Sequence, residues 1–146
     1  MIAIKRIYDV KDGEYDEVWA IIRSDKKLRL NKRYDFMKCV KELSPEWGLF
    51  TNYRKWVEEK IWNKDTFVNN YVPQFIHDLK NNSQAHTLLT QLCELDKSGK
   101  SICLVCFCED ETLCHRSIIA GILQGLGCNV TGVTQDYSAY YKIYAG

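Results

Sequence analysis

The residues best suited to chemistry form one short segment near the C-terminus, Cys114-His115-Arg116-Ser117. A continuous apolar run at 102–107 and a polar loop at 109–112 precede it, and apolar residues at helical spacing follow it as far as Leu126. This order predicts a strand buried on both faces, a loop and a helix. Ligands of open α/β sheets bind beyond the carboxyl ends of the strands, and a helix N-terminus suits an anion such as phosphate. We therefore expect the working site at this segment.

Each side chain of the segment has its own role in this hypothesis. Arg116 offers a planar fork for phosphate or carboxylate, and Ser117 adds a hydroxyl, so both are candidate ligand-binding residues. His115 can donate a hydrogen bond or move a proton near neutral pH, and the helix dipole would favour a thiolate at Cys114. Cys114 and His115 are therefore candidate catalytic residues. In the simpler alternative, Arg116 pairs with an acid of the loop at 109–111 and His115 is merely solvated.

Two specific cysteine chemistries fit the sequence less well. Phosphotyrosine-phosphatase chemistry needs a cysteine and an arginine six residues apart, whereas Arg116 lies two residues after Cys114 and eight after Cys108. The ligand types of tetrahedral zinc occur at Cys106, Cys108, Cys114 and His115. However, adjacent side chains on a helix diverge by about 100°, which would separate Cys114 from His115, and no Cys-x-x-Cys pair occurs. We predict neither a metal nor a cofactor, and a zinc-stabilised interaction module stays as an alternative.

Basic residues elsewhere extend the expected site. The stretch 23–33 contains six Lys or Arg residues against one acid, Asp25, and would follow a strand at 18–22. If this stretch overhangs the same sheet edge, Arg23 can hold a phosphate, and a solvated loop is the alternative. Arg6, near the end of a first strand, and Cys108, directly after the strand at 102–107, complete the predicted ligand-binding set.

The composition describes one ordinary domain over residues 1–146. Hydrophobic residues make up 46% and charged residues 27% of the chain, which is typical of a folded protein and argues against disorder. No apolar run approaches the roughly 18 residues needed to span a bilayer. The formal net charge of +1 gives no reason to expect general nucleic-acid binding. Because the seven cysteines are an odd number without an export signal, we expect free thiols in a cytoplasmic protein.

The hydrophobic pattern predicts a small α/β domain. Strands are expected at 2–8, 18–22, 102–107 and 128–133. Helices are expected at 34–43, from the Ser44-Pro45 start to about 60, from Asp65 onward with a kink or break at Pro73, through Leu88 to Leu95, and at about 113–126. The unit 102–133 indicates a C-terminal β-α-β crossover, so we predict a three-layer-like domain with a mostly parallel sheet. The tyrosines at 137–144 would pack on the surface of the domain or on a second subunit of a homodimer.

The sequence also resembles a known family. Leu-Val-Cys-Phe-Cys at 104–108 and Cys-His-Arg-Ser-Ile-Ile-Ala at 114–120 resemble the signature of the bacterial and phage family catalogued as domain of unknown function 488. The opening segment 5–9, the Leu-Ser-Pro at 43–45 and the pair Phe67 and Tyr71 are similar to further elements of that family. Many members carry an Asp-Arg-Leu-Trp-Pro-Arg-Gly stretch, which 19–24 lacks, and Arg23 is the arginine that could replace one of theirs. The resemblance implies a compact α/β fold and supplies no established reaction.

These observations lead to one primary hypothesis and two alternatives. The primary hypothesis is the binding of a nucleotide or another phosphorylated small molecule, and phage-type relatives make sequestration of a nucleotide signal its expected use by analogy. The first alternative is a hydrolase or transferase that acts on a nucleotide through Cys114 or His115. The second is the zinc-stabilised interaction module.

Overall fold

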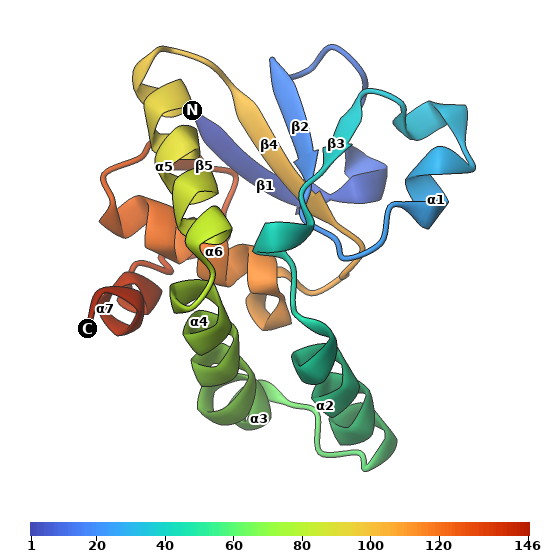
Figure 1. Ribbon diagram of the computed structural model, residues 1–146, viewed down its shortest axis with the longest axis vertical. Helices are drawn as coiled ribbons and strands as arrows, with labels where there is room; N and C mark the ends of the chain where they lie inside the picture. The colour runs from blue at the N-terminus through green and yellow to red at the C-terminus, as the bar shows by residue number, and fades with distance from the viewer.

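A five-stranded sheet forms the centre of the molecule, and the computed structural model describes residues 1–146. The strands are β1 (Ile2–Arg6), β2 (Glu17–Ala20), β3 (Met37–Cys39), β4 (Ile102–Cys106) and β5 (Val130–Thr131). They lie in the order β3-β2-β4-β1-β5, and every neighbouring pair is parallel. The predicted α/β fold is confirmed, and the sheet is parallel throughout. All carboxyl ends therefore point toward one edge, which faces downward in Figure 1.

The middle strand and the helix after it agree with the sequence pattern. Every residue of β4 is buried, as its continuous apolar run predicts. Helices α5 (Ser83–Lys97) and α6 (His115–Gly125) both pack against β4. Helix α6 carries the chain from β4 to β5 with β1 between them, which is the predicted β-α-β crossover. The residues of α6 from His115 to Leu123 are all buried, so the first turn of this helix belongs to the core.

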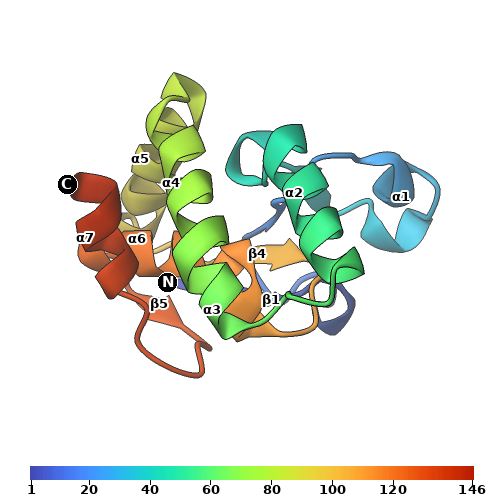
Figure 2. The same cartoon turned by 90° about the horizontal axis from the view of Figure 1, so that it is seen from below.

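Two helical segments project beyond the carboxyl edge of the sheet (Figure 1). One is α2 (Trp47–Glu58), and the other runs through α3 (Lys64–Thr66), a π-helical turn (Phe67–Tyr71) and α4 (Val72–Lys80). From below, the end of the sheet lies between these segments (Figure 2). The interruption predicted at Pro73 takes the form of the π-helical turn, which directly precedes α4 and leaves the proline in its first turn.

The predicted helix at 34–43 is wrong. The chain forms β3 there, flanked by two 3-10 turns, and Met37 pairs with Val18 as Cys39 pairs with Ala20. The N–H of Val40 also donates to the carbonyl of Ala20 at 2.8 Å. These bonds to a neighbouring strand outweigh the helical spacing of the local apolar residues, because the pairing partner is absent from any local pattern.

Smaller differences affect element boundaries. Helix α2 begins at Trp47 rather than at Ser44-Pro45, and the Ser44 hydroxyl donates to the carbonyl of Lys41 at 2.6 Å instead of capping α2. The stretch expected as a plain loop at 24–33 contains the short helix α1 (Lys26–Arg29).

The C-terminal tyrosines pack on this domain. Helix α7 (Ala139–Ala145) lies against α6, and the preceding Tyr137 is buried. A Cβ at Gly121 would lie 2.0 Å from the carbonyl oxygen of Tyr137, so the close approach requires glycine there. No helix of the structure has the length and apolar character needed to cross a membrane.

Candidate functional site

A cavity of about 670 Å³ opens at the carboxyl edge of the sheet. Its walls come from the segment after β2, from α2, from aromatic residues near α3 and from the loop after β4. These strands are neighbours in the sheet, with Ala20 beside Val105, so the segments that follow them emerge side by side. This is the place where open parallel sheets bind their ligands, and the volume is typical of a small-molecule site.

One wall of the cavity is aromatic. Its residues are Trp47, Phe50, Tyr53, Trp62 and Tyr71. The ring of Tyr53 meets that of Trp62 edge-on with centroids 4.7 Å apart, and Trp62 in turn lies 5.6 Å from Tyr71. Trp47 and Phe50 are 60% and 40% exposed, so much of each side chain remains accessible to a ligand.

A second part of the lining, the basic wall, carries positive charge from Arg23, Lys26 and Lys27. Arg23 is held in place because its Nε donates to the carbonyl of Pro45 at 3.1 Å and its Nη2 to that of Ser44 at 3.3 Å. The front of the basic stretch thus lines the same cavity as the loop after β4.

The rest of the basic stretch makes contacts elsewhere. Arg29 pairs with Asp25 at 3.0 Å, and Arg33 donates to the carbonyl of Tyr8. Two acids, Glu109 and Asp110, also line the cavity, so three cations face two carboxylates there.

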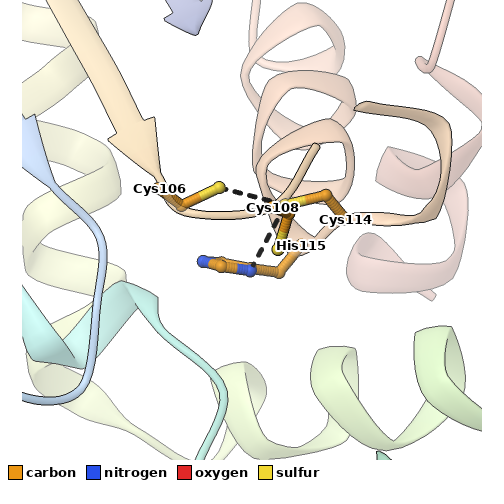
Figure 3. A group of neighbouring side chains, drawn as sticks. All are labelled: Cys106, Cys108, Cys114 and His115. Atoms are coloured by element: carbon orange, nitrogen blue, oxygen red, sulfur yellow. Dashed lines mark hydrogen bonds between the residues drawn. The ribbon is translucent and has the colours of Figure 1, made fainter. Parts of the chain in front are cut away.

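Three thiols and an imidazole form one group at the floor of the cavity, where all of them except Cys114 belong to its lining. The ligand atoms of Cys106, Cys108, Cys114 and His115 all lie within 4.8 Å of one another (Figure 3). Two sulfurs, those of Cys106 and Cys114, are 3.1 Å apart, and the sulfur of Cys114 is 3.7 Å from Nδ1 of His115. The other ring nitrogen, Nε2, donates to the carbonyl of Ile21 at 2.8 Å. His115 is only 5% exposed, so it is not the solvated residue of the simpler alternative.

The expected divergence of Cys114 and His115 is wrong, and the backbone gives the reason. Helix α6 begins at His115, and Cys114 is its N-cap with extended angles of φ −128° and ψ 146°. The rotation of about 100° between neighbours applies only within a helix. The two side chains can therefore converge on one point, as Figure 3 shows.

Arg116 lies behind the thiols and does not line the cavity. It is 3% exposed, and its Nη1 donates to the sulfur of Cys106 at 3.2 Å and to the carbonyl of Cys108 at 2.7 Å. It forms no ion pair with a carboxylate. The alternative in which it pairs with an acid of the loop is therefore also wrong: Glu109 pairs instead with Arg6 at 3.7 Å, and the carboxylate of Glu111 accepts from Tyr137.

The predicted site residues therefore divide into two groups. Arg23, Cys108 and His115 line the cavity, whereas Arg6, Arg116, Ser117 and Cys114 do not. Cys114 is only 1% exposed, so its thiol cannot contact a ligand in the cavity directly. Ser117 is fully buried and donates to the carbonyl of Cys114 at 2.7 Å, which closes the first turn of α6.

The thiols differ in their affinity for protons. Hydrogen bonds from Cys108 and Cys114 hold the pKa of Cys106 well below its usual value, and His115 and Arg116 add favourable charge. The bond with Cys106 raises the pKa of Cys108 to about 12. Burial raises the pKa of Cys114 well above its usual range. Cys106, rather than Cys114, is thus the thiol that the surroundings favour as a thiolate.

The sequence did not predict the aromatic wall, nor that Cys106 contacts both Cys114 and Arg116. A signal for the wall exists in the spacing of Trp47, Phe50 and Tyr53, which recur every third residue and so share one face of α2. Nothing in the local sequence marks Cys106 as the partner of Arg116, since their contact depends on how α6 packs against β4.

Comparison with known proteins places the chain in a family. No curated protein and no solved structure matches it. One family model does, over residues 2–127, and its description is "Active DUF488-N3 subclade". This match covers most of the chain, and it confirms the resemblance carried by the Cys-His-Arg segment. The protein is therefore a member of the DUF488-N3a family.

Proposed function

We propose that this protein binds a nucleotide or another phosphorylated small molecule in the cavity at the carboxyl edge of the sheet. The observation that carries the proposal is that one cavity of about 670 Å³ is lined both by an aromatic wall and by a basic wall. A nucleotide has the same two parts, a flat apolar base and an anionic phosphate.

The aromatic wall supports binding of the base. Trp47 and Phe50 are large rings with much of their surface exposed at the cavity. Stacking of a base on an aromatic ring is worth about 1–3 kcal/mol and tolerates any base, because every base has a π face. This wall therefore favours nucleotides in general over phosphate alone.

The basic wall supports binding of the phosphate. Arg23 keeps a planar guanidinium at the cavity, and Lys26 and Lys27 add two point charges. Charge-assisted hydrogen bonds from such groups to phosphate are among the stronger polar contacts in proteins. This set replaces Arg116 as the proposed phosphate partner, because the guanidinium of Arg116 is buried against sulfur and carbonyl groups.

The test is isothermal titration calorimetry with nucleoside mono-, di- and triphosphates and with the matching nucleosides. Phosphorylated forms should bind more tightly than nucleosides, and the double variant Lys26→Ala/Lys27→Ala should weaken nucleotide binding by roughly tenfold, or about 1.4 kcal/mol. Lys32→Ala is the matched control, because Lys32 belongs to the same basic stretch but does not line the cavity.

A second pair of variants tests the aromatic wall. Phe50→Ala should weaken nucleosides and nucleotides by a similar factor, whereas Ile143→Ala, which removes an exposed apolar side chain from α7, should leave both unchanged. The proposal is overturned if no member of the panel binds, or if nucleosides bind as tightly as nucleotides and the lysine variants change nothing.

A further inference from the structure

We infer that Cys106, Cys108, Cys114 and His115 bind one Zn²⁺ ion at the floor of the cavity. This site goes beyond the proposed nucleotide binding, and it requires no ligand in the cavity above it.

The donor atoms have the type and spacing that zinc requires. Three thiols and one imidazole form a common set for a four-coordinate structural site. With Zn–S near 2.3 Å and Zn–N near 2.1 Å, a tetrahedral arrangement places the donor atoms roughly 3.5–3.8 Å from one another. The four atoms here lie within 4.8 Å of one another, and the contacts from Cys114 are 3.1 Å to Cys106 and 3.7 Å to His115. Side-chain adjustments of an ångström or less would complete the tetrahedron.

The imidazole is oriented as in a metal site. A carbonyl oxygen can only accept, so the contact of 2.8 Å with Ile21 places an N–H on Nε2 of His115. Nδ1, the nitrogen that faces the sulfur of Cys114, is then the ring atom that would offer its lone pair to the ion. Metal-bound histidines commonly donate their other ring N–H to a backbone carbonyl, which fixes the ring and its tautomer.

The buried guanidinium of Arg116 supplies an independent argument from charge. It is 3% exposed, it has no carboxylate partner, and its Nε has no hydrogen-bond acceptor. An isolated buried cation is costly. One Zn²⁺ with three thiolates and a neutral histidine carries a net charge of −1, and Arg116 would neutralise it. Its Nη1 lies 3.2 Å and 3.6 Å from the sulfurs of Cys106 and Cys114, where this charge would reside.

The position of the four ligands indicates a structural role for the ion. Its ligands come from the end of β4, from the loop after it, and from the N-cap and first residue of α6. Four protein ligands leave no open position, which is typical of a structural rather than a catalytic zinc. The ion would fasten the loop that forms one side of the cavity.

The test measures metal in the reduced, full-length protein. We expect about one equivalent of zinc by elemental analysis after purification with a thiol reductant, and tetrahedral thiolate absorption bands when Co²⁺ replaces zinc. Cys108→Ser should lose both signals while the protein stays folded by circular dichroism, since Cys108 is exposed. Cys93→Ser is the matched control: Cys93 lies 2.9 Å from the sulfur of Cys128, but that pair does not belong to a group of three or more ligands.

Several results would overturn the inference. One is folded, reduced wild-type protein with far less than one equivalent of zinc and no cobalt bands. A second is a Cys106–Cys114 disulfide as the dominant state after reductive purification. A third is a Cys108→Ser variant that keeps full metal content. Because metal content is measured without nucleotide, and the lysine variants leave these four ligands intact, failure of one proposal is distinguishable from failure of the other.

Discussion

The carboxylate of Glu111 holds the loop after β4 to the chain that follows β5, and its replacement provides a quantitative test. Its Oε2 accepts three hydrogen bonds: from the N–H of Thr134 at 3.0 Å, from the hydroxyl of Thr134 at 2.7 Å and from the hydroxyl of Tyr137 at 2.6 Å. The same loop supplies Cys108, Asp110 and other residues of the cavity. The substitution Glu111→Gln keeps the size of the side chain and removes its charge.

The expected loss of stability follows from these three bonds. A hydrogen bond to a charged group contributes about 1.5–3 kcal/mol when it is well shielded. Glu111 is only half-buried, and glutamine keeps one oxygen that can accept, so we expect a total loss of about 1–2 kcal/mol at pH 7. For a domain of this size that corresponds to a decrease in Tm of about 3–6 °C. Thermal unfolding followed by circular dichroism resolves such a change.

The pH dependence of this loss has a definite sign. Burial alone would raise the pKa of Glu111, but the hydrogen bonds from Tyr137 and Thr134 lower it below its usual value of 4.5. A carboxyl whose pKa is lower in the folded state stabilises the fold above its unfolded pKa. That contribution disappears as the pH falls through the folded pKa. The difference in stability between wild type and Glu111→Gln should be full at pH 7 and shrink below about pH 4.5.

The control is Glu109→Gln in the same loop. The side chain of Glu109 is 85% exposed and pairs with Arg6 at 3.7 Å, so its loss should change stability by less than about 0.5 kcal/mol. The reasoning is refuted if Glu111→Gln and Glu109→Gln have equal effects at pH 7, or if the effect of Glu111→Gln grows as the pH falls.

Three further changes probe the packing and the cavity. Gly121→Ala should lower the free energy of unfolding by about 3 kcal/mol, since its Cβ would lie 2.0 Å from a backbone oxygen. The control Gly48→Ala should be neutral or stabilising by up to about 1 kcal/mol, because its Cβ meets nothing within 4 Å. Similar effects of the two variants in urea denaturation would contradict this reasoning. Phe67→Ala should cost about 3–5 kcal/mol in the same assay because the ring is fully buried, and a cost under about 1 kcal/mol would show that the ring is not part of a rigid core. Trp47→Phe should reduce the change in tryptophan fluorescence on nucleotide binding, and an unchanged signal would exclude Trp47 from the binding surface.

The sequence predicted a helix or strand correctly where neighbouring residues alone carry the pattern of that element. β4 is buried on both faces, so its whole run is apolar and identifies a central strand by itself. Helix α6 has apolar residues at helical spacing over most of its length. The segment 34–43 failed because β3 is only three residues long and exists through its pairing with β2, a contact that no local pattern contains.

The sequence placed the Cys-His-Arg segment after a buried strand, but it did not give the direction of the side chains. Of the residues predicted near the loop after β4, Cys108 and His115 line the cavity. Arg116 is the next residue along α6, yet it points to the buried side of the thiols. Which residues of a first helical turn face a cavity depends on the rotation of the helix about its axis. Packing of α6 against β4 sets that rotation.

The sequence by itself determined that this is an α/β chain with Cys114-His115-Arg116-Ser117 at the start of the helix after a buried strand. Those features depend on the order and periodicity of neighbouring residues. Only the tertiary structure decided that Cys106 meets Arg116, that Cys114 and His115 converge with two further thiols, and that α2 and the basic stretch line one cavity. The contact of Cys106 with Arg116 and the cavity shared by α2 and the basic stretch depend on how helices and strands pack. The convergence of Cys114 and His115 depends on the extended backbone of the N-cap, and the order and periodicity of neighbouring residues specify none of these.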